Sequence, residues 1–293
     1  MKTTRIAAID IGSNAMRLLI NNVIEIDGKR YFKKMNIVRV PIRLGTESFK
    51  DKKIQPHTAE RLIEAMKAYS YLMKAHEVSI YRGCATSAMR EAKNGTTIIE
   101  EIKSKAGIEI EIISGKEEAQ IIYATHIAQL LNPEKHYLYV DVGGGSTEIT
   151  YFANNKTVSS KSFNIGTIRI LNDMVNTRMW EEMRLWLLET VENKEVELIG
   201  SGGNINKLFK ISRKAQNKPL SYDYVRKFLK TLKEYTYEER IINLDLNPDR
   251  ADVIIPALDI YSNIMRWTKA EKIYVPKIGL SDGIIRQLVE NEL

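Results

Sequence analysis

One stretch decides the fold: Val140-Asp141-Val142-Gly143-Gly144-Gly145-Ser146-Thr147-Glu148. Three successive glycines follow an apolar strand, and because glycine lacks a Cβ they let several backbone N–H groups turn toward one anion. A tight hairpin turn needs one or two glycines rather than three. The pattern therefore predicts a phosphate-binding loop between two strands, and its candidate phosphate contacts are Gly143, Gly144, Gly145, Ser146 and Thr147.

Two acids flank this loop. Asp141 and Glu148 are seven residues apart, at the ends of the two strands, where their oxygens are suited to a hard divalent cation held partly through water. A metal ion combined with backbone donors is what phosphoryl transfer requires, since most of that catalysis is stabilisation of spread-out charge. We therefore predict Mg²⁺ (or Mn²⁺) as the cofactor.

The same pattern opens the chain. Asp10-Ile11-Gly12-Ser13-Asn14 follows the apolar run 6–9 and precedes a second one at 18–20, and Asp10 lies 131 residues before Asp141. Recurrence of a whole strand–loop–strand unit at this distance indicates duplication of a domain. Gly12, Ser13, Asn14 and Arg17 are further candidate phosphate contacts, and Asp10 is a third candidate metal ligand.

Alternating strand and helix patterns predict an α/β protein of two domains. The first comprises residues 1–122, completed by a C-terminal helix over 280–293, and the second comprises 123–279. A helix over 58–76 is expected to bury Leu62, Met66, Tyr69 and Met73. A third strand is predicted over 31–44 and a short one over 108–113. A long helix over 115–131 is expected to join the domains.

Three further motifs allow a structural or a functional interpretation. Arg90, just after a strand, can offer its planar fork to phosphate oxygens or pair with an acid on the surface. Glu118 follows Glu117 at a helix start, where acids are favoured by the helix dipole, and it is also a candidate general base. Gly202 and Gly203 lie in a third strand–glycine loop, which suits another phosphate or close packing.

Composition restricts the remaining classes of protein. No apolar run in the 293 residues approaches the roughly 20 that a membrane helix needs. A single cysteine, Cys84, fits a reducing compartment, so a cytoplasmic location and no membrane partner are expected. The net charge is +7, with basic segments at 29–53 and 204–240 that favour polyanions. No nucleic-acid partner is expected, because no helix-turn-helix, zinc finger or aromatic RNA-binding stripe is found.

Taken together, four motifs resemble the exopolyphosphatase / guanosine pentaphosphate phosphohydrolase (Ppx/GppA) family in its short, two-domain form. They lie at 10–18, 85–95, 113–119 and 141–148, with later echoes at 163–169, 200–203 and 279–283. The resemblance implies two duplicated actin-like ATPase (ribonuclease H-like) domains with an interdomain active-site cleft. It implies that Glu118 is the catalytic base, and it matches Asp141 and Glu148 to the acids near the metal and the attacking water. Ala15 and Asn204 depart from the family's usual Thr or Ser.

The leading hypothesis is a hydrolase that releases terminal phosphate from inorganic polyphosphate. The nearest alternative substrate is guanosine pentaphosphate (pppGpp), which would lose its 5′ terminal phosphate. Two other classes stay open: a non-catalytic polyphosphate or alarmone sensor, and an actin-like kinase or ATPase. A homodimer also stays open, without a residue-level argument for it.

Overall fold

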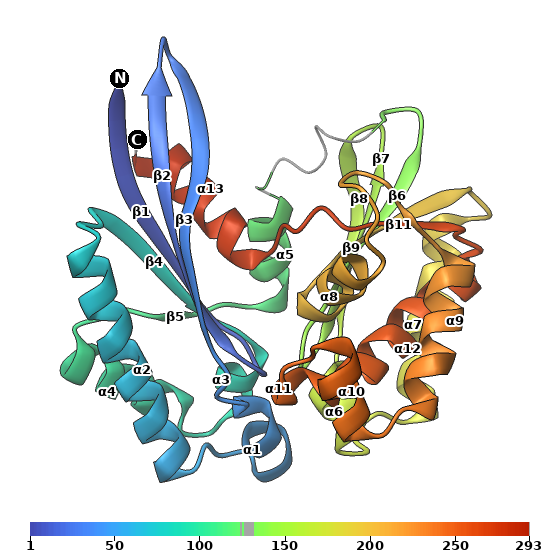
Figure 1. Cartoon of the computed structure of the whole chain (residues 1–293), viewed down its shortest axis with the longest axis horizontal. Helices are drawn as coiled ribbons and strands as arrows, with labels where there is room; N and C mark the ends of the chain where they lie inside the picture. The colour runs from blue at the N-terminus through green and yellow to red at the C-terminus, as the bar shows by residue number, and fades with distance from the viewer. Residues whose placement is uncertain (124, 126–131, 293) are drawn as a thin grey trace. The chain divides into compact units, whose positions relative to one another are not determined.

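The computed structural model describes every residue except 124, 126–131 and 293. The chain divides into two compact units (Figure 1). Unit 1 comprises Met1–Thr125 together with Leu280–Leu293, and unit 2 comprises His126–Gly279. The C-terminal helix therefore belongs to the same unit as the N-terminal strands.

Unit 1 is built on a five-stranded sheet in the order β3-β2-β1-β4-β5. Strands β1, β2 and β3 form an antiparallel meander, whereas β4 and β5 continue the sheet parallel to β1. Its strands are β1 (Lys2–Ile11), β2 (Met16–Ile26), β3 (Lys29–Val40), β4 (Ile80–Ala85) and β5 (Glu111–Ile112). Its helices are α1 (Leu44–Asp51), α2 (Pro56–Ala75), α3 (Ser87–Glu91), α4 (Gly95–Ala106), α5 (Gly115–Tyr123) and α13 (Leu280–Glu292).

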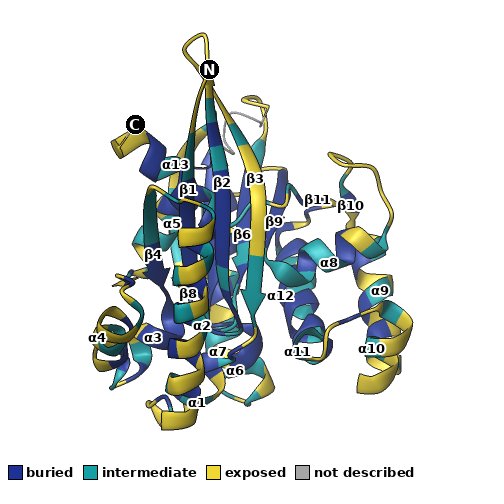
Figure 2. Ribbon diagram, turned by 60° about the vertical axis from the view of Figure 1, so that its left-hand side comes forward, coloured by how far each residue is buried: buried dark blue, intermediate teal, exposed yellow. Residues whose placement is uncertain are grey.

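Helices cover both faces of this sheet (Figure 1). Helix α2 buries the apolar side that the sequence predicted, Leu62, Met66, Tyr69 and Met73, while its outer side is exposed (Figure 2). On the opposite face, α13 packs against β1, β2, β4 and α5. The helices cross closely at Gly283, where a Cβ would lie 2.0 Å from the carbonyl oxygen of Ile121.

Unit 2 repeats the topology of unit 1. Its sheet has the order β10-β11-β9-β6-β7-β8, so that β8-β7-β6-β9-β11 matches β3-β2-β1-β4-β5 strand for strand. The duplication predicted from Asp10 and Asp141 is thereby confirmed. The strands are β6 (His136–Val142), β7 (Thr147–Ala153), β8 (Lys156–Phe163), β9 (Val196–Ser201), β10 (Leu220–Ser221) and β11 (Lys272–Tyr274). The helices are α6 (Thr167–Leu171), α7 (Thr177–Val191), α8 (Gly203–Ile211), α9 (Tyr222–Glu234), α10 (Tyr237–Leu244), α11 (Pro248–Ala251) and α12 (Ile254–Thr268).

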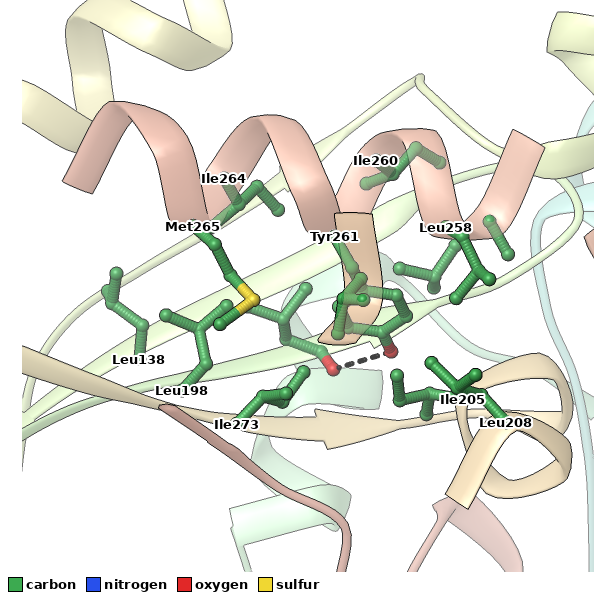
Figure 3. Close-up of a cluster of buried hydrophobic side chains, with 14 of the residues drawn as sticks. Leu138, Leu198, Ile205, Leu208, Leu258, Ile260, Tyr261, Ile264, Met265 and Ile273 are labelled. Atoms are coloured by element: carbon green, nitrogen blue, oxygen red, sulfur yellow. Dashed lines mark hydrogen bonds between the residues drawn. The ribbon is translucent and has the colours of Figure 1, made fainter. Parts of the chain in front are cut away.

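The core of unit 2 forms between the sheet and α12 (Figure 3). Helix α12 is apolar on most of its surface, as expected for a helix enclosed by its neighbours. Tyr261 is fully buried there, and its hydroxyl lies within hydrogen-bond distance of the carbonyl oxygens of Val140, at 3.2 Å, and Ser201. Both acceptors belong to strands of the central sheet. The phenol therefore ties α12 to the strand ends from which the glycine loops depart.

Several sequence-based boundaries were wrong. The third strand ends at Val40 rather than 44, because Pro41 has no N–H to continue the ladder, and Leu44 begins α1. The strand expected over 108–113 is only Glu111–Ile112. Helix α5 ends at Tyr123 and Thr125 lies in a turn, so the helix predicted over 115–131 is not continuous; residues 124 and 126–131 lie outside the described part of the chain.

None of the helices in the part of the chain that the structure describes has the length and apolar character needed to cross a membrane. The longest, α2, has 20 residues but alternates buried and exposed positions.

The packing of α2 predicts an effect of removing one hydroxyl. The Tyr69 hydroxyl lies 3.1 Å from the carbonyl oxygen of Val38 and 3.3 Å from that of Met16. Tyr69→Phe leaves these carbonyls without that donor and is expected to cost about 1–2 kcal/mol of unfolding free energy, measured by urea denaturation. Tyr71→Phe on the same helix is the matched control, because Tyr71 is 73% exposed. Equal stability of the two variants would contradict this account of the packing.

Candidate functional site

The two duplicated hairpin loops are closed by the same hydrogen bond. In unit 1 the N–H of Gly12 donates to the carbonyl oxygen of Ala15 at 3.2 Å, and in unit 2 that of Gly143 donates to Ser146 at 2.9 Å. A Cβ on either glycine would lie 3.1–3.2 Å from the accepting oxygen. Each loop is therefore drawn tight at the end of its strands.

In unit 2 the register places four polar side chains in one row across the sheet. Asp141 of β6 pairs with Ser201 of β9 on one side and with Glu148 of β7 on the other, and Glu148 pairs with Ser162 of β8. Directly opposed residues project from the same face of a sheet. The hydroxyl of Ser162 donates to Glu148 at 2.8 Å. We call Ser201, Asp141, Glu148 and Ser162 the unit 2 row.

The third glycine loop lies against this row. Gly202 has φ +113°, in a region that only glycine adopts readily. A Cβ there would approach the carbonyl oxygen of Val142 to 2.9 Å and the Oδ1 atom of Asp141 to 3.4 Å. Gly203 follows as the first residue of α8. Both glycine loops of unit 2 therefore border Asp141.

Two residues that sequence reasoning did not single out shape the Gly143–Gly145 loop. Arg169 is buried, and its Nε donates to the carbonyl oxygen of Gly145 at 2.7 Å. Gly166 lies so close that a Cβ would be 2.4 Å from the carbonyl oxygen of Gly144. The resemblance to the family included the segment 163–169, but no pattern in the sequence predicts that this segment folds back on the loop.

The two hydroxyl residues of the loop are both buried. Thr147 donates its hydroxyl to the carbonyl oxygen of Ile165 at 2.6 Å, so that this hydrogen bond belongs to the fold. The phosphate contacts predicted for Ser146 and Thr147 stay predictions.

Unit 1 carries the corresponding row with different chemistry. Asp10 pairs with Arg17 of β2 and with Cys84 of β4, and Arg17 pairs with Arg39 of β3. Nη1 of Arg17 lies 3.4 Å from Oδ2 of Asp10. Burial raises the pKa of the Asp10 carboxyl, and the positive charge of Arg17 partly offsets that shift. We call Cys84, Asp10, Arg17 and Arg39 the unit 1 row.

The first loop is supported from two sides within unit 1. The Ser13 hydroxyl is 2.9 Å from that of Ser87 at the start of α3, and both residues are buried. The carbonyl oxygen of Asn14 accepts from the N–H of Arg43 at 2.9 Å. Ser13 and Asn14, predicted as phosphate contacts, thus lie in a loop that is fixed at both sides.

Helix α5 lies on the face of the sheet that carries Asp10. Arg82 is on β4 two residues before Cys84 and so projects from that face; its guanidinium pairs with Glu117 at 3.0 Å. Glu118, the next residue, is half-buried. Arg90 donates to the carbonyl oxygen of Ile113, at 2.6 Å, just before α5 begins. Glu117 therefore forms an ion pair within unit 1, and Arg90 lies beside the beginning of the same helix.

Cys84 is not an activated nucleophile. Its side chain is fully buried in the unit 1 row, and burial raises the pKa of the thiol to about 12.

The side chains of the unit 2 row carry carboxylate and hydroxyl oxygens, which are the types of ligand that a magnesium ion prefers. Among the described residues no three His, Cys, Asp or Glu side chains cluster as a ready-made metal cage. Mg²⁺ is usually held by one or two carboxylates, with water and substrate phosphates as the other ligands, and Asp141 and Glu148 supply two opposed carboxylates in one unit. Asp10, the third predicted ligand, lies in unit 1.

The predicted site residues divide between the units. Unit 1 holds Asp10, Gly12, Ser13, Asn14, Arg17, Arg90 and Glu118, and unit 2 holds Asp141, Gly143, Gly144, Gly145, Ser146, Thr147, Glu148, Gly202 and Gly203. In unit 2 these residues lie in the two glycine loops and the adjacent row, whereas in unit 1 Arg90 and Glu118 lie on α3 and α5, apart from the Gly12 loop in sequence.

Comparison with known protein families decides the family. The model of the Ppx/GppA phosphatase family matches residues 23–292. The chain belongs to the Ppx/GppA phosphatase family. The crystal structure of the Aquifex aeolicus Ppx/GppA family member covers 100% of both chains, with 27% identity and a TM-score of 0.77. An exopolyphosphatase structure from Cytophaga hutchinsonii, at 23% identity and a TM-score of 0.82 over 98% of each chain, shares the fold.

Two curated proteins illustrate the range of this Ppx/GppA chain's relatives. A bifunctional 3-dehydroquinate synthase/phosphatase of Fusobacterium nucleatum is 29% identical over 98% of this chain and 47% of its own length. Exopolyphosphatase 2 of Mycobacterium tuberculosis is 30% identical over 58% of this chain and 54% of its own length. The chain thus spans about half the length of each of these two relatives.

The close approach at Gly166 predicts that a methyl group there displaces the glycine loop. Gly166→Ala is expected to cost about 1–3 kcal/mol of unfolding free energy through overpacking and to lower phosphatase activity strongly. Gly107→Ala is the control: its left-handed φ of +67° also costs stability, but nothing lies within 4 Å of the new Cβ. Activity and thermal unfolding of both variants are compared. If the two variants retain equal activity, Gly166 does not shape the loop.

Proposed function

We propose that this chain is a phosphoanhydride hydrolase that releases the terminal phosphate of inorganic polyphosphate. The family membership supports the reaction class, and relatives named exopolyphosphatase support the substrate. The net charge of +7 suits a polyanionic substrate.

The proposal rests on one observation: the three-glycine loop joins β6 and β7 next to two directly opposed carboxylates, one on each strand. Backbone N–H groups freed by glycine bind phosphate oxygens, while Asp141 and Glu148 supply hard oxygen ligands directly across from each other. Arg169 donates a hydrogen bond to the carbonyl oxygen of Gly145, and Gly166 packs closely against Gly144, so both residues fix the conformation of the loop. Such fixed donors stabilise developing charge without reorganising during the reaction.

The proposed reaction is attack of water on the terminal phosphorus. A new P–O bond forms to the water oxygen, the bond to the bridging oxygen breaks, and the shortened chain leaves with the bridging oxygen. Glu118 is proposed to accept the proton of the attacking water. Arg17 and Arg90 would bind phosphate oxygens through their guanidinium forks, together with the loop residues Gly12, Ser13 and Asn14.

Asp141 and Glu148 would hold Mg²⁺ or Mn²⁺, with Asp10 as a further candidate. When bound, the metal would supply positive charge to offset the charge on the phosphoryl oxygens. In its absence the same two carboxylates would face an anionic substrate directly, which is unfavourable. This explains why two acids next to a phosphate-binding loop are compatible with its function.

The alternative substrate is pppGpp, which is equally consistent with membership of the Ppx/GppA phosphatase family. It offers the same terminal phosphoanhydride, so the residues proposed for the reaction do not change. A sensor that binds without cleaving would share these contacts but would not depend on Glu118 for function.

We also infer a cytoplasmic location. The single cysteine is buried and unpaired, as is common for proteins of a reducing compartment.

The neighbouring glutamates of α5 provide a matched pair of variants. Glu118→Gln is expected to lower kcat for phosphate release about 100- to 10,000-fold, because proton transfer to a positioned base is lost, while tripolyphosphate binding is kept. Glu117→Gln removes the same charge from the same helix turn but only breaks the ion pair with Arg82, so its kcat should stay within a few-fold of wild type.

Phosphate release from polyphosphate and from pppGpp would be measured with Mg²⁺, and with a chelator as the zero-activity reference. Equal losses in the two variants would mean that both acids act only at the helix start, and Glu118 would not be the base. Binding of either substrate without cleavage by the wild type would favour the sensor.

A further inference from the structure

The unit 1 row contains a side chain that no part of the proposed reaction uses. Arg39 of β3 is directly opposite Arg17 of β2, which in turn is opposite Asp10 of β1. Opposed residues on neighbouring strands have Cβ atoms only about 5 Å apart and project from one face. Two guanidinium groups and one carboxylate therefore lie side by side at the strand ends next to the Gly12 loop.

The duplicated unit is an internal control for what the fold itself requires. In unit 2 the position of Arg39 is taken by Ser162, and that of Arg17 by Glu148, whereas Asp10 and Asp141 correspond. A sheet of the same order thus accommodates a small neutral side chain at this register. The folding of such a sheet does not require a guanidinium at position 39, and a cross-strand pair of like charges is in itself unfavourable.

Two other basic residues of β3, on the same face as Arg39, contact helix α13. Lys34 pairs with Asp282 of α13 at 2.6 Å, and Arg30 donates to the carbonyl oxygen of Val289 at 3.3 Å. Helix α13 therefore covers the far part of this face. Arg39 is five residues beyond Lys34, about 16 Å along the strand.

This end of β3 is accessible to solvent. Ile37, which precedes Arg39 on the strand by two residues, is 56% exposed, and Arg39 itself is partly exposed. The arginine is thus close to the predicted phosphate-binding loop and within reach of a ligand from solvent.

We propose that Arg39 is a second phosphate-binding arginine, which together with Arg17 holds consecutive phosphate groups of the substrate on unit 1. The inference rests on the proposed function and names a binding residue for it. Each planar guanidinium can make two parallel hydrogen bonds to phosphate oxygens, and adjacent arginines match a ligand whose anionic groups repeat along a chain. In the unit 2 row, carboxylates and hydroxyls occupy the same positions and suit a cation instead.

The test compares steady-state kinetics of Arg39→Ala and Lys33→Ala with polyphosphate as substrate. Lys33 lies on the same strand, is exposed and faces Asn22 rather than Arg17, so both variants lose one positive charge of β3. Arg39→Ala is expected to raise KM about tenfold or more, as for loss of a hydrogen-bonded charged contact, with kcat within about threefold. Lys33→Ala should leave KM within about twofold. Arg39→Lys should restore only part of the affinity, because it keeps the charge but not the fork.

An unchanged KM in Arg39→Ala, or a loss confined to kcat, would overturn the inference, as would equal KM changes in Arg39→Ala and Lys33→Ala. If the wild type cleaves neither polyphosphate nor pppGpp, the proposed function fails separately, and calorimetric binding of tripolyphosphate decides the role of Arg39. Weaker binding by Arg39→Ala than by Lys33→Ala then supports the phosphate site, and equal binding overturns it. Thermal unfolding of each variant checks that the sheet is intact.

Discussion

The whole arrangement depends on the antiparallel register that each hairpin loop fixes at its sheet end. The hydrogen bonds from Gly12 to Ala15 and from Gly143 to Ser146 close loops of equal length, so Asp10 faces Arg17 and Asp141 faces Glu148. A slip of one residue would turn every one of these side chains to the other face. The register therefore determines which side chains lie next to the glycine loop in each unit.

Within this shared geometry the two copies have diverged in charge. The unit 2 row presents carboxylates and hydroxyls, whereas the unit 1 row presents arginines beside one buried carboxylate. The hydrophobic core that α12 forms in unit 2 contains none of the four residues of the unit 2 row. Our proposal assigns the metal to unit 2 and the phosphate-binding arginines and the base to unit 1 because of this difference.

Periodicity and glycine patterns were sufficient to predict the duplication, the buried side of α2 and the loops that border Asp141. They did not predict what lies across the sheet from a given residue, because cross-strand partners depend on register and not on spacing in the chain. Strand pairing alone shows that Arg39 lies opposite Arg17 and that Ser162 lies opposite Glu148. No strand was predicted at the position of β8. Gly166 and Arg169 were overlooked for a similar reason, since α6 and the residue before it contact the Gly143–Gly145 loop across about 24 residues of the chain. The predicted end of the third strand at residue 44 was wrong because Pro41 ends the hydrogen-bond ladder after Val40.

The most direct test of the central claim is a crystal structure of the Glu118→Gln variant with tripolyphosphate and Mn²⁺, whose anomalous signal locates the metal. The account predicts the metal on Asp141 and Glu148, with phosphate oxygens on the N–H groups of Gly143–Gly145 and on the Arg17 guanidinium. Phosphates bound away from both glycine loops, or a metal that contacts neither carboxylate, would contradict it.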